Sequence, residues 1–150
     1  MIDQWFPRLK SLGYRITSPE SNLYNCVAWA VPDSERWWWP DPMQLSYWPS
    51  AAPREETMEA FIEAFHTLGY TPCSHGASEP GFEKIALFVD SVGKPAHAAR
   101  QLPSGKWTSK LGAGPDIEHT LEGLAASPYG TVAQFLKRPR GKTNLIEVSR

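Results

Sequence analysis

The stretch KIALFVDSVGKPAHAARQLPSGKWTSKL, residues 84–111, decides the fold of this chain. It holds three short apolar runs, separated by turn residues in the manner of β-strands, at 84–90, 96–102 and 107–111. The residues Pro103 to Lys106 join the last two runs as a hairpin. We therefore predict an antiparallel sheet built on this stretch, with residues 129–136 as a further strand.

Helical patterns surround the predicted sheet. Residues 55–68 place their apolar side chains on one helical stripe, which ends at Gly69. Shorter helical patterns occupy 6–12, 23–31 and 116–125. Because most of these helices precede the strands, we predict an α+β fold with N-terminal helices packed on a mostly antiparallel sheet of about four to five strands.

The size and charge of the chain exclude several classes of protein. Its 150 residues suffice for one hydrophobic core, so residues 1–150 are expected to form a single domain. The 15 basic and 16 acidic side chains leave a net charge of −1, which argues against general binding of nucleic acid. No stretch approaches the roughly 20 apolar residues of a membrane span, and the first residues lack an apolar leader. We therefore expect a cytoplasmic protein that does not bind membranes.

Two segments stand apart from the regular elements. Residues 32–53 combine five prolines with clustered tryptophans, which predicts an ordered, irregular excursion over the surface. Within it we expect Trp37 and Trp39 to fill the core and Trp38 to contact a ligand. Residues 139–150 are basic and are expected to form a loosely ordered tail.

Cys26 is the candidate nucleophile. It falls in the first turn of the predicted helix 23–31, where a thiolate is stabilised, although free cysteines are more commonly packed in the core. The side-chain amides of Asn22 and Asn25, together with backbone N–H groups, are candidate donors to an oxyanion. The single Cys73-x-His75 pair is too small for a structural zinc site, and no phosphate-binding loop is present. We therefore predict neither a metal nor another cofactor.

His97 is the candidate general base, because small alanines flank it and leave room for the imidazole to face another element. It can equally be a histidine packed against the sheet. A base needs an orienting partner, for which Asp116 and Ser109 are candidates. A four-residue hairpin loop would place Lys110 on the face of His97, where it could bind an acidic substrate group, and Ser109 on the other face. Asp116 has a second explanation, as the cap of the predicted helix 116–125.

The motifs YNCVAWA at 24–30, HAARQ at 97–101 and KWTSKLG at 106–112 follow the order nucleophile, base, third residue. In this order the chain resembles the papain-like cysteine peptidase and amidase superfamily, in particular its compact bacterial NlpC-type and CHAP-type members. The same motifs, with DIEH at 116–119 and Tyr129-Gly130, resemble a group of small uncharacterised bacterial proteins. The superfamily resemblance implies a papain-like fold with Cys26 as nucleophile and His97 as base.

Two functions follow from these observations. The first is a cysteine hydrolase, a peptidase, amidase or deamidase, that acts on an amide of a protein or peptide through Cys26 and His97. The second is a non-catalytic module that keeps the fold and holds a partner protein with its aromatic loop. The arrangement of the thiol and the imidazole distinguishes them.

Overall fold

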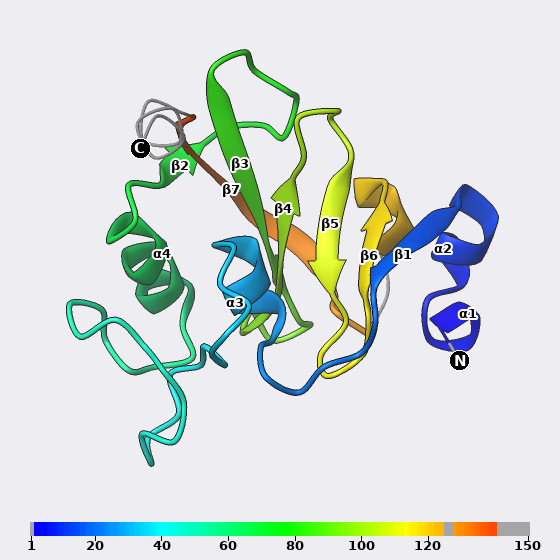
Figure 1. The fold of residues 1–150 in the computed structure, drawn as a ribbon. Coiled ribbons are helices and arrows are strands. Elements are labelled where there is room, and N and C mark those ends of the chain that lie inside the picture. Colours follow the sequence, from blue (N-terminus) through cyan, green and yellow to red (C-terminus); the bar gives the residue numbers. More distant parts are fainter. Residues whose placement is uncertain (1, 125–127, 141–150) are drawn as a thin grey trace, which may run out of the picture.

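The structure is a computed structural model, and it describes residues 2–124 and 128–140. Within these residues the chain forms a seven-stranded sheet in which every neighbouring pair is antiparallel, in the order β1-β6-β5-β4-β3-β7-β2 (Figure 1). The strands are β1 Tyr14–Ser18, β2 Thr71–Cys73, β3 Phe82–Val89, β4 Pro95–Gln101, β5 Trp107–Lys110, β6 Asp116–His119 and β7 Thr131–Pro139.

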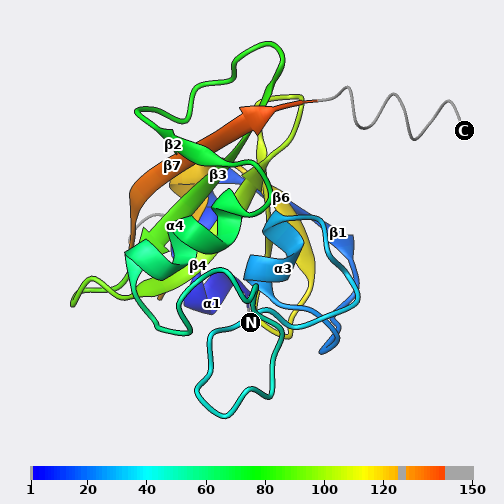
Figure 2. The ribbon, with the colours of Figure 1, turned by 90° about the vertical axis from the view of Figure 1, so that its left-hand side faces the viewer.

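Short helices cover the two faces of the sheet. They are α1 Ile2–Trp5, α2 Pro7–Leu12, α3 Cys26–Ala30, α4 Met58–His66 and the 3₁₀ turn η1 Leu121–Leu124. Helices α3 and α4 lie side by side over one face (Figures 1 and 2). Residues of α2 and η1 pack with the opposite face. We call these the α3 face and the η1 face.

The alternation of side chains along β4 separates the two cores. Ala98 is paired with Leu87, and both belong to the cluster of Cys26 on the α3 face. Ala99 is paired with Ala86, and both belong to the cluster on the η1 face. Successive strand residues point to opposite faces, so His97 lies on the η1 face with its partner Phe88.

Several predicted elements are confirmed. The four predicted strands correspond to β3, β4, β5 and β7, with boundaries that differ by at most three residues. The amphipathic segment forms α4, which begins after the Thr57 cap and buries Phe61 and Phe65 against the sheet. The predicted helix 23–31 shortens to the five residues of α3.

The predicted fold class is wrong. The described chain is mostly a sheet of seven strands with a few short helices, not a set of N-terminal helices on a papain-like sheet of four to five strands. The missing strands are β1, β2 and β6. Residues 116–119 form β6 instead of starting a helix, because they pair with β1 on one side and β5 on the other. Pairing of this kind overrides a weak helical pattern.

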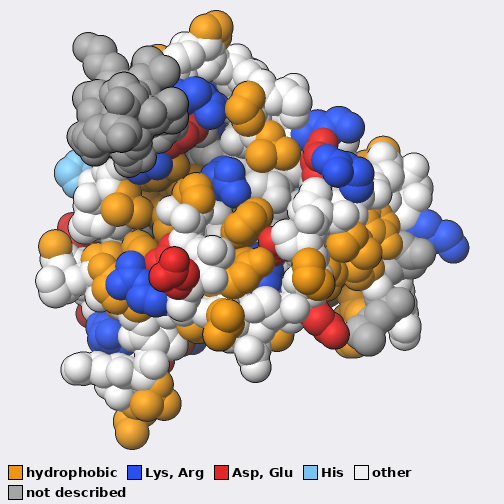
Figure 3. All heavy atoms as spheres, viewed as in Figure 1, with side chains coloured by type: hydrophobic (Ala, Val, Ile, Leu, Met, Phe, Trp, Pro, Cys, Tyr) orange, Lys and Arg blue, Asp and Glu red, His pale blue; other side chains and the backbone are white. Residues whose placement is uncertain are grey.

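Residues 32–53 contain no helix or strand, and their two legs are joined by a single bridge between Trp38 and Tyr47. This loop runs to the bottom of Figure 1, where Figure 3 shows apolar side chains at the surface. Met43 and Leu45 are the most exposed large apolar residues of the loop. Of the predicted basic tail, Pro139 ends β7 and residues 141–150 lie outside the described residues.

Candidate functional site

Cys26 lies at an open pocket on the α3 face. The pocket has a volume of about 310 Å³, at the lower end of the range for small-ligand sites. Apolar surface dominates, and the lining residues are Asn25, Cys26, Trp37, Trp39, Ala96, Gly112 and Tyr129. The tryptophans come from the aromatic loop, so that loop supplies part of the wall. We call this the Cys26 pocket.

The thiol of Cys26 is neutral at neutral pH. Burial raises its pKa to about 11, which outweighs the backbone N–H groups of Ala98 and Val27 and the positive charge of Lys110. The thiolate predicted for this position is therefore not the resting form. The backbone contact also shows where the sulfur lies, because Ala98 is the residue that follows His97 on β4.

The hydrogen bonds of the Asn25 side chain hold α3 in place. Its side-chain oxygen accepts hydrogen bonds from the N–H of Ala28 at 3.2 Å and of Trp38 at 3.0 Å, and its amide donates to the Trp38 carbonyl at 2.7 Å. It therefore caps α3 and ties the aromatic loop to it. Asn22 is exposed and does not line the Cys26 pocket. Of the two predicted oxyanion donors, only Asn25 lies at the pocket.

His97 belongs to a buried chain of hydrogen bonds on the η1 face. Its Nε2 lies 2.9 Å from Ser109 Oγ, which lies 2.7 Å from His119 Nε2. His119 Nδ1 lies 2.6 Å from the carbonyl oxygen of Thr120. The other nitrogen of His97, Nδ1, is buried and has no hydrogen-bond partner among the described residues. Ser109 is thus the residue that holds His97.

The hairpin register explains why Ser109, expected on the other face, meets His97. The N–H of Leu102 donates to the Lys106 carbonyl at 2.7 Å, so the loop has three residues, one fewer than predicted. Gly105 adopts a φ of 93°, which such a three-residue loop requires. A register shift of one residue moves every side chain to the opposite face. Ser109 therefore joins His97, and Lys110 turns to the α3 face.

Cys26 and His97 lie on opposite faces of the sheet, Cys26 on helix α3 and His97 on strand β4. Cys26 packs in the α3-face cluster, while His97 contacts Phe88 and Ser109 on the η1 face. Tyr129 lies next to both. Its ring stacks on the imidazole at 4.0 Å with an interplanar angle of 6°, and it also lines the Cys26 pocket. The pairing of β4 with β5 covers only residues 100–101 and 107–108, so the strands separate near His97.

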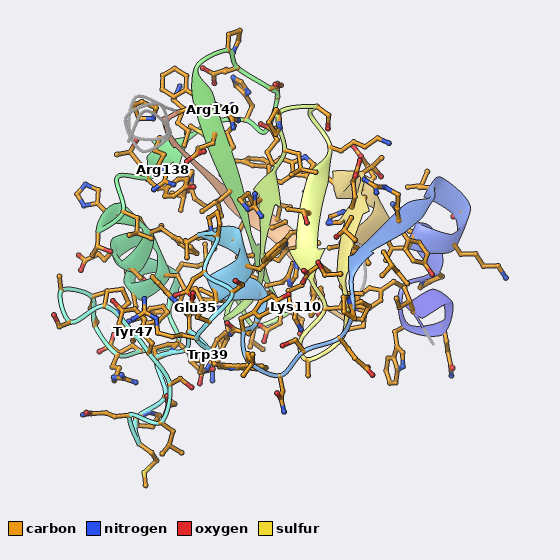
Figure 4. All side chains as sticks on the ribbon, viewed as in Figure 1. Glu35, Trp39, Tyr47, Lys110, Arg138 and Arg140 are labelled. Carbon is orange, nitrogen blue, oxygen red and sulfur yellow. The ribbon has the colours of Figure 1, made fainter. Side chains whose placement is uncertain are left out.

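Asp116 does not contact His97. It is fully buried on the α3 face, where one carboxylate oxygen accepts a hydrogen bond from the Tyr24 hydroxyl at 2.8 Å. It lies in β6 instead of capping a helix. Lys110, labelled in Figure 4 close to α3, donates to the carbonyls of Ser21, Gly112 and Gly114. These three bonds occupy the donors of its ammonium group, so Lys110 holds loops rather than a substrate group.

The tryptophans of the loop have the opposite arrangement from the predicted one. Trp38 is 3% exposed, and its indole N–H donates to Asp33 at 2.9 Å. Trp37 and Trp39 are half-buried and line the Cys26 pocket. The reason is the pairing of Trp38 with Asn25 and Tyr47, which draws the middle tryptophan inward.

Two residues of this region were missed by sequence reasoning. His119 was assigned to a helix, and the signal that places it correctly is the alternation of Ile117 and His119 on the buried side of a strand. Tyr129 was assigned to a strand without a role. No sequence pattern predicts its stack on His97, because the contact joins segments that are more than thirty residues apart.

Comparison with known families gives a match over most of the chain. Residues 15–137 match the family described as a domain of unknown function, DUF7689. The chain belongs to this family. The match spans the strands from β1 to β7 and includes Cys26, His97, Ser109 and His119. No match was found among curated proteins or among solved structures.

Two further findings concern this DUF7689 domain. In the described part of the chain, no three His, Cys, Asp or Glu side chains are grouped so that they could hold a metal ion. Among the same residues, no helix has the length and apolar character needed to cross a bilayer.

Proposed function

We propose that this domain is a cysteine hydrolase that acts on an amide of a protein or peptide, with Cys26 as nucleophile, His97 as general base and Ser109 as the residue that orients the base. The observation that carries this proposal is the state of the imidazole. Its Nε2 is held by Ser109, whereas its Nδ1 is buried and unpaired. A base that is fixed at one nitrogen and open at the other is the arrangement that general-base catalysis needs.

The free-energy cost of burying the hydrogen-bonded residues His97, Ser109 and His119 supports a catalytic role. His97, Ser109 and His119 are each no more than 2% exposed, and apolar side chains such as Phe88, Ile117 and Leu124 surround them. Burying polar groups in such surroundings is unfavourable unless every group is paired, and Nδ1 of His97 is not. A module that only held a partner at the Cys26 pocket would not need this chain on the opposite face.

The reaction begins with a neutral pair. As Sγ of Cys26 attacks the amide carbon, the thiol proton passes to Nδ1 of His97. Backbone N–H groups near the sulfur, those of Val27 and Ala98, are candidate donors to the oxyanion. The C–N bond then breaks, and Nδ1 returns the proton to the leaving amine. Water then attacks the thioester carbon and gives one proton to Nδ1, and Nδ1 passes this proton to the departing Sγ, so that the carboxylic acid, the free thiol and the neutral imidazole result.

The proposal requires the thiol and Nδ1 to meet when substrate binds. The sulfur lies against the N–H of Ala98, directly after His97, at the place where β4 and β5 are no longer paired. Tyr129 occupies the same region. A shift of Tyr129 on substrate binding would bring the Cys26 pocket into contact with the imidazole.

A second candidate is the non-catalytic binding module. The positions of Cys26 and His97 on opposite faces of the sheet favour it. The raised pKa of the Cys26 thiol and the apolar walls supplied by Trp37 and Trp39 favour it as well. In this case a peptide segment would occupy the pocket, and Cys26 would be part of its floor.

A covalent probe separates the two functions. A peptidyl vinyl sulfone with an apolar side chain next to the electrophile is incubated with the Cys73→Ser protein, in which Cys26 is the only thiol. Intact mass then follows labelling in this background and in His97→Ala and His97→Gln. A hydrolase loses about 10²-fold or more of its labelling rate when the base is removed. Equal labelling with and without His97 supports the binding module.

A further inference from the structure

The proposed function requires a lone pair on Nδ1 of His97, and Ser109 alone does not guarantee it. A serine hydroxyl can donate its one hydrogen or accept one. If Ser109 donated to Nε2 of His97, the imidazole proton would sit on Nδ1 and the base would be blocked. The direction of the hydrogen bond between Ser109 and His97 therefore decides whether His97 can act.

The direction of this bond is set at the other end of the hydrogen-bond chain, where His119 meets the Thr120 carbonyl. The carbonyl oxygen of Thr120 can only accept, so Nδ1 of His119 carries the proton in their 2.6 Å contact. A neutral His119 then has its lone pair on Nε2, and Ser109 must donate to it across 2.7 Å. Because this bond uses the only hydrogen of the hydroxyl, Ser109 can only accept from Nε2 of His97. Nδ1 of His97 is left with the lone pair.

The surroundings keep His119 neutral. It is 2% exposed, and burial lowers its pKa. The neighbouring carboxylates on β6 belong to Asp116 and Glu118, which alternate with His119 and point to the other face. Asp116 bonds to Tyr24, and Glu118 pairs with Arg15 and faces Lys106. Phe88 and Tyr129 flank His97 with aromatic rings.

We propose that His119 is a positioning residue, which acts through the Ser109 hydroxyl to hold the proton of His97 on Nε2 and leave Nδ1 free. This inference rests on the proposed function, in which Nδ1 of His97 is the general base. It assigns His119, the third member of the hydrogen-bond chain, a role that packing alone would not require. Because the Thr120 carbonyl can only accept, it determines which group donates in each hydrogen bond of the chain.

The tautomer of each histidine is read by long-range ¹H–¹⁵N correlation spectra of ¹⁵N-histidine-labelled protein at about pH 8, where free histidine is neutral. In the wild type we expect His97 as the Nε2–H form and His119 as the Nδ1–H form. His119→Phe removes the acceptor for Ser109, so His97 is expected to move partly or wholly to the Nδ1–H form. His119→Gln keeps both an acceptor and a donor and should restore the Nε2–H form.

Glu118→Gln is the matched control, because it changes the adjacent residue of β6 on the opposite face. It should leave both tautomers as in the wild type. A wild-type His97 in the Nδ1–H form overturns the inference even if His119→Phe does not fold, and so does an unchanged tautomer in a folded His119→Phe.

Labelling by the vinyl sulfone probe distinguishes this inference from the proposed function. If both hold, His119→Phe lowers the labelling rate of Cys26 and His119→Gln recovers it, with a loss of up to about 10⁴-fold, the effect known for a base in the wrong tautomer. If the tautomers behave as expected but labelling does not depend on His97, the proposed function fails and the positioning role of His119 in the chain stands.

Discussion

His97 and Ser109 are joined by a hydrogen bond of 2.9 Å on the face of the sheet opposite to the Cys26 core cluster. This bond gives the imidazole a fixed orientation and leaves Nδ1 as its one unpaired nitrogen. It also makes Ser109, not Asp116, the partner of the base, because Asp116 bonds to Tyr24 on the other face. The predictions below follow from this arrangement.

Ser109→Ala is expected to slow the labelling of Cys26 by the vinyl sulfone probe, because His97 loses the group that orients it. It should also reduce the free energy of unfolding by about 1–3 kcal/mol, since two buried imidazole nitrogens lose their partner. Thr108→Val is the matched control, for it removes the hydrogen bond from Trp29 on the α3 face of the same strand. The control should lower stability without changing the labelling rate; similar labelling in both variants would argue against a role for Ser109.

The free energy of unfolding is expected to fall below about pH 6.5, the ordinary pKa of histidine. Burial lowers the pKa of both His97 and His119 in the folded state, so the unfolded chain binds more protons in acid. Their contribution to stability is fully present above the unfolded pKa and is lost as the pH falls, by up to about 1.4 kcal/mol per pH unit for each excess proton. Urea unfolding at several pH values measures this slope. His119→Gln should flatten this slope; an unchanged slope in that variant would show that His119 does not contribute to it.

Gly105→Ala is expected to destabilise the protein by about 1–2 kcal/mol, because φ at this position is 93° and L-residues avoid that region. No atom lies within 4 Å of the added Cβ, so the loss is conformational rather than steric. Gly105→Asn should lose less, since asparagine tolerates left-handed backbone better. Thermal midpoints of the two variants and of the wild type test this, and a Gly105→Ala midpoint equal to that of the wild type would show that the turn does not depend on glycine.

Tyr24→Phe is expected to lower stability by about 1–3 kcal/mol, because it leaves the buried Asp116 carboxylate without the hydroxyl that it accepts from. Burial, together with the same contact, raises the pKa of Tyr24 to about 12. His97→Ala should slow the labelling of Cys26 by the same factor in the Tyr24→Phe protein as in the wild type. A smaller factor in the Tyr24→Phe protein would indicate that Asp116 takes part in catalysis.

The sequence was sufficient for the strands that carry strong local patterns. The 84–90 run and the hairpin that follows it become β3, β4 and β5 because apolar runs between turn residues are local signals. The strand β6 lacked such a signal, since Asp116 and Ile117 fit a helix start as well as a strand. Only its pairing with β1 and β5 decides between them, and that pairing joins Tyr14 to His119 across most of the chain.

Some residues of the candidate site could be proposed from the sequence, but its geometry could not. Cys26, His97 and Ser109 were identified from their residue types and order. Whether Ser109 or Lys110 faces His97 depends on a single loop residue, because the three-residue loop closed at Lys106 shifts the register by one. The thiol pKa follows from burial, which sequence spacing does not reveal. Sequence spacing also does not reveal which tryptophan of the loop is buried, so Trp37 was expected to be buried and Trp38 exposed, whereas in the structure Trp38 is buried and Trp37 is half-buried.

The pH dependence of Cys26 labelling is the most direct test of the account. Second-order rates with the vinyl sulfone probe are measured in the Cys73→Ser background, with and without His97→Ala, from about pH 7 to about pH 11. If His97 removes the thiol proton, labelling near neutral pH exceeds that of His97→Ala by about 10²-fold or more, and the two rates converge as the thiol ionises near its pKa of about 11. If the two profiles coincide and both rise only as the thiol ionises, His97 is not the base and the account is contradicted.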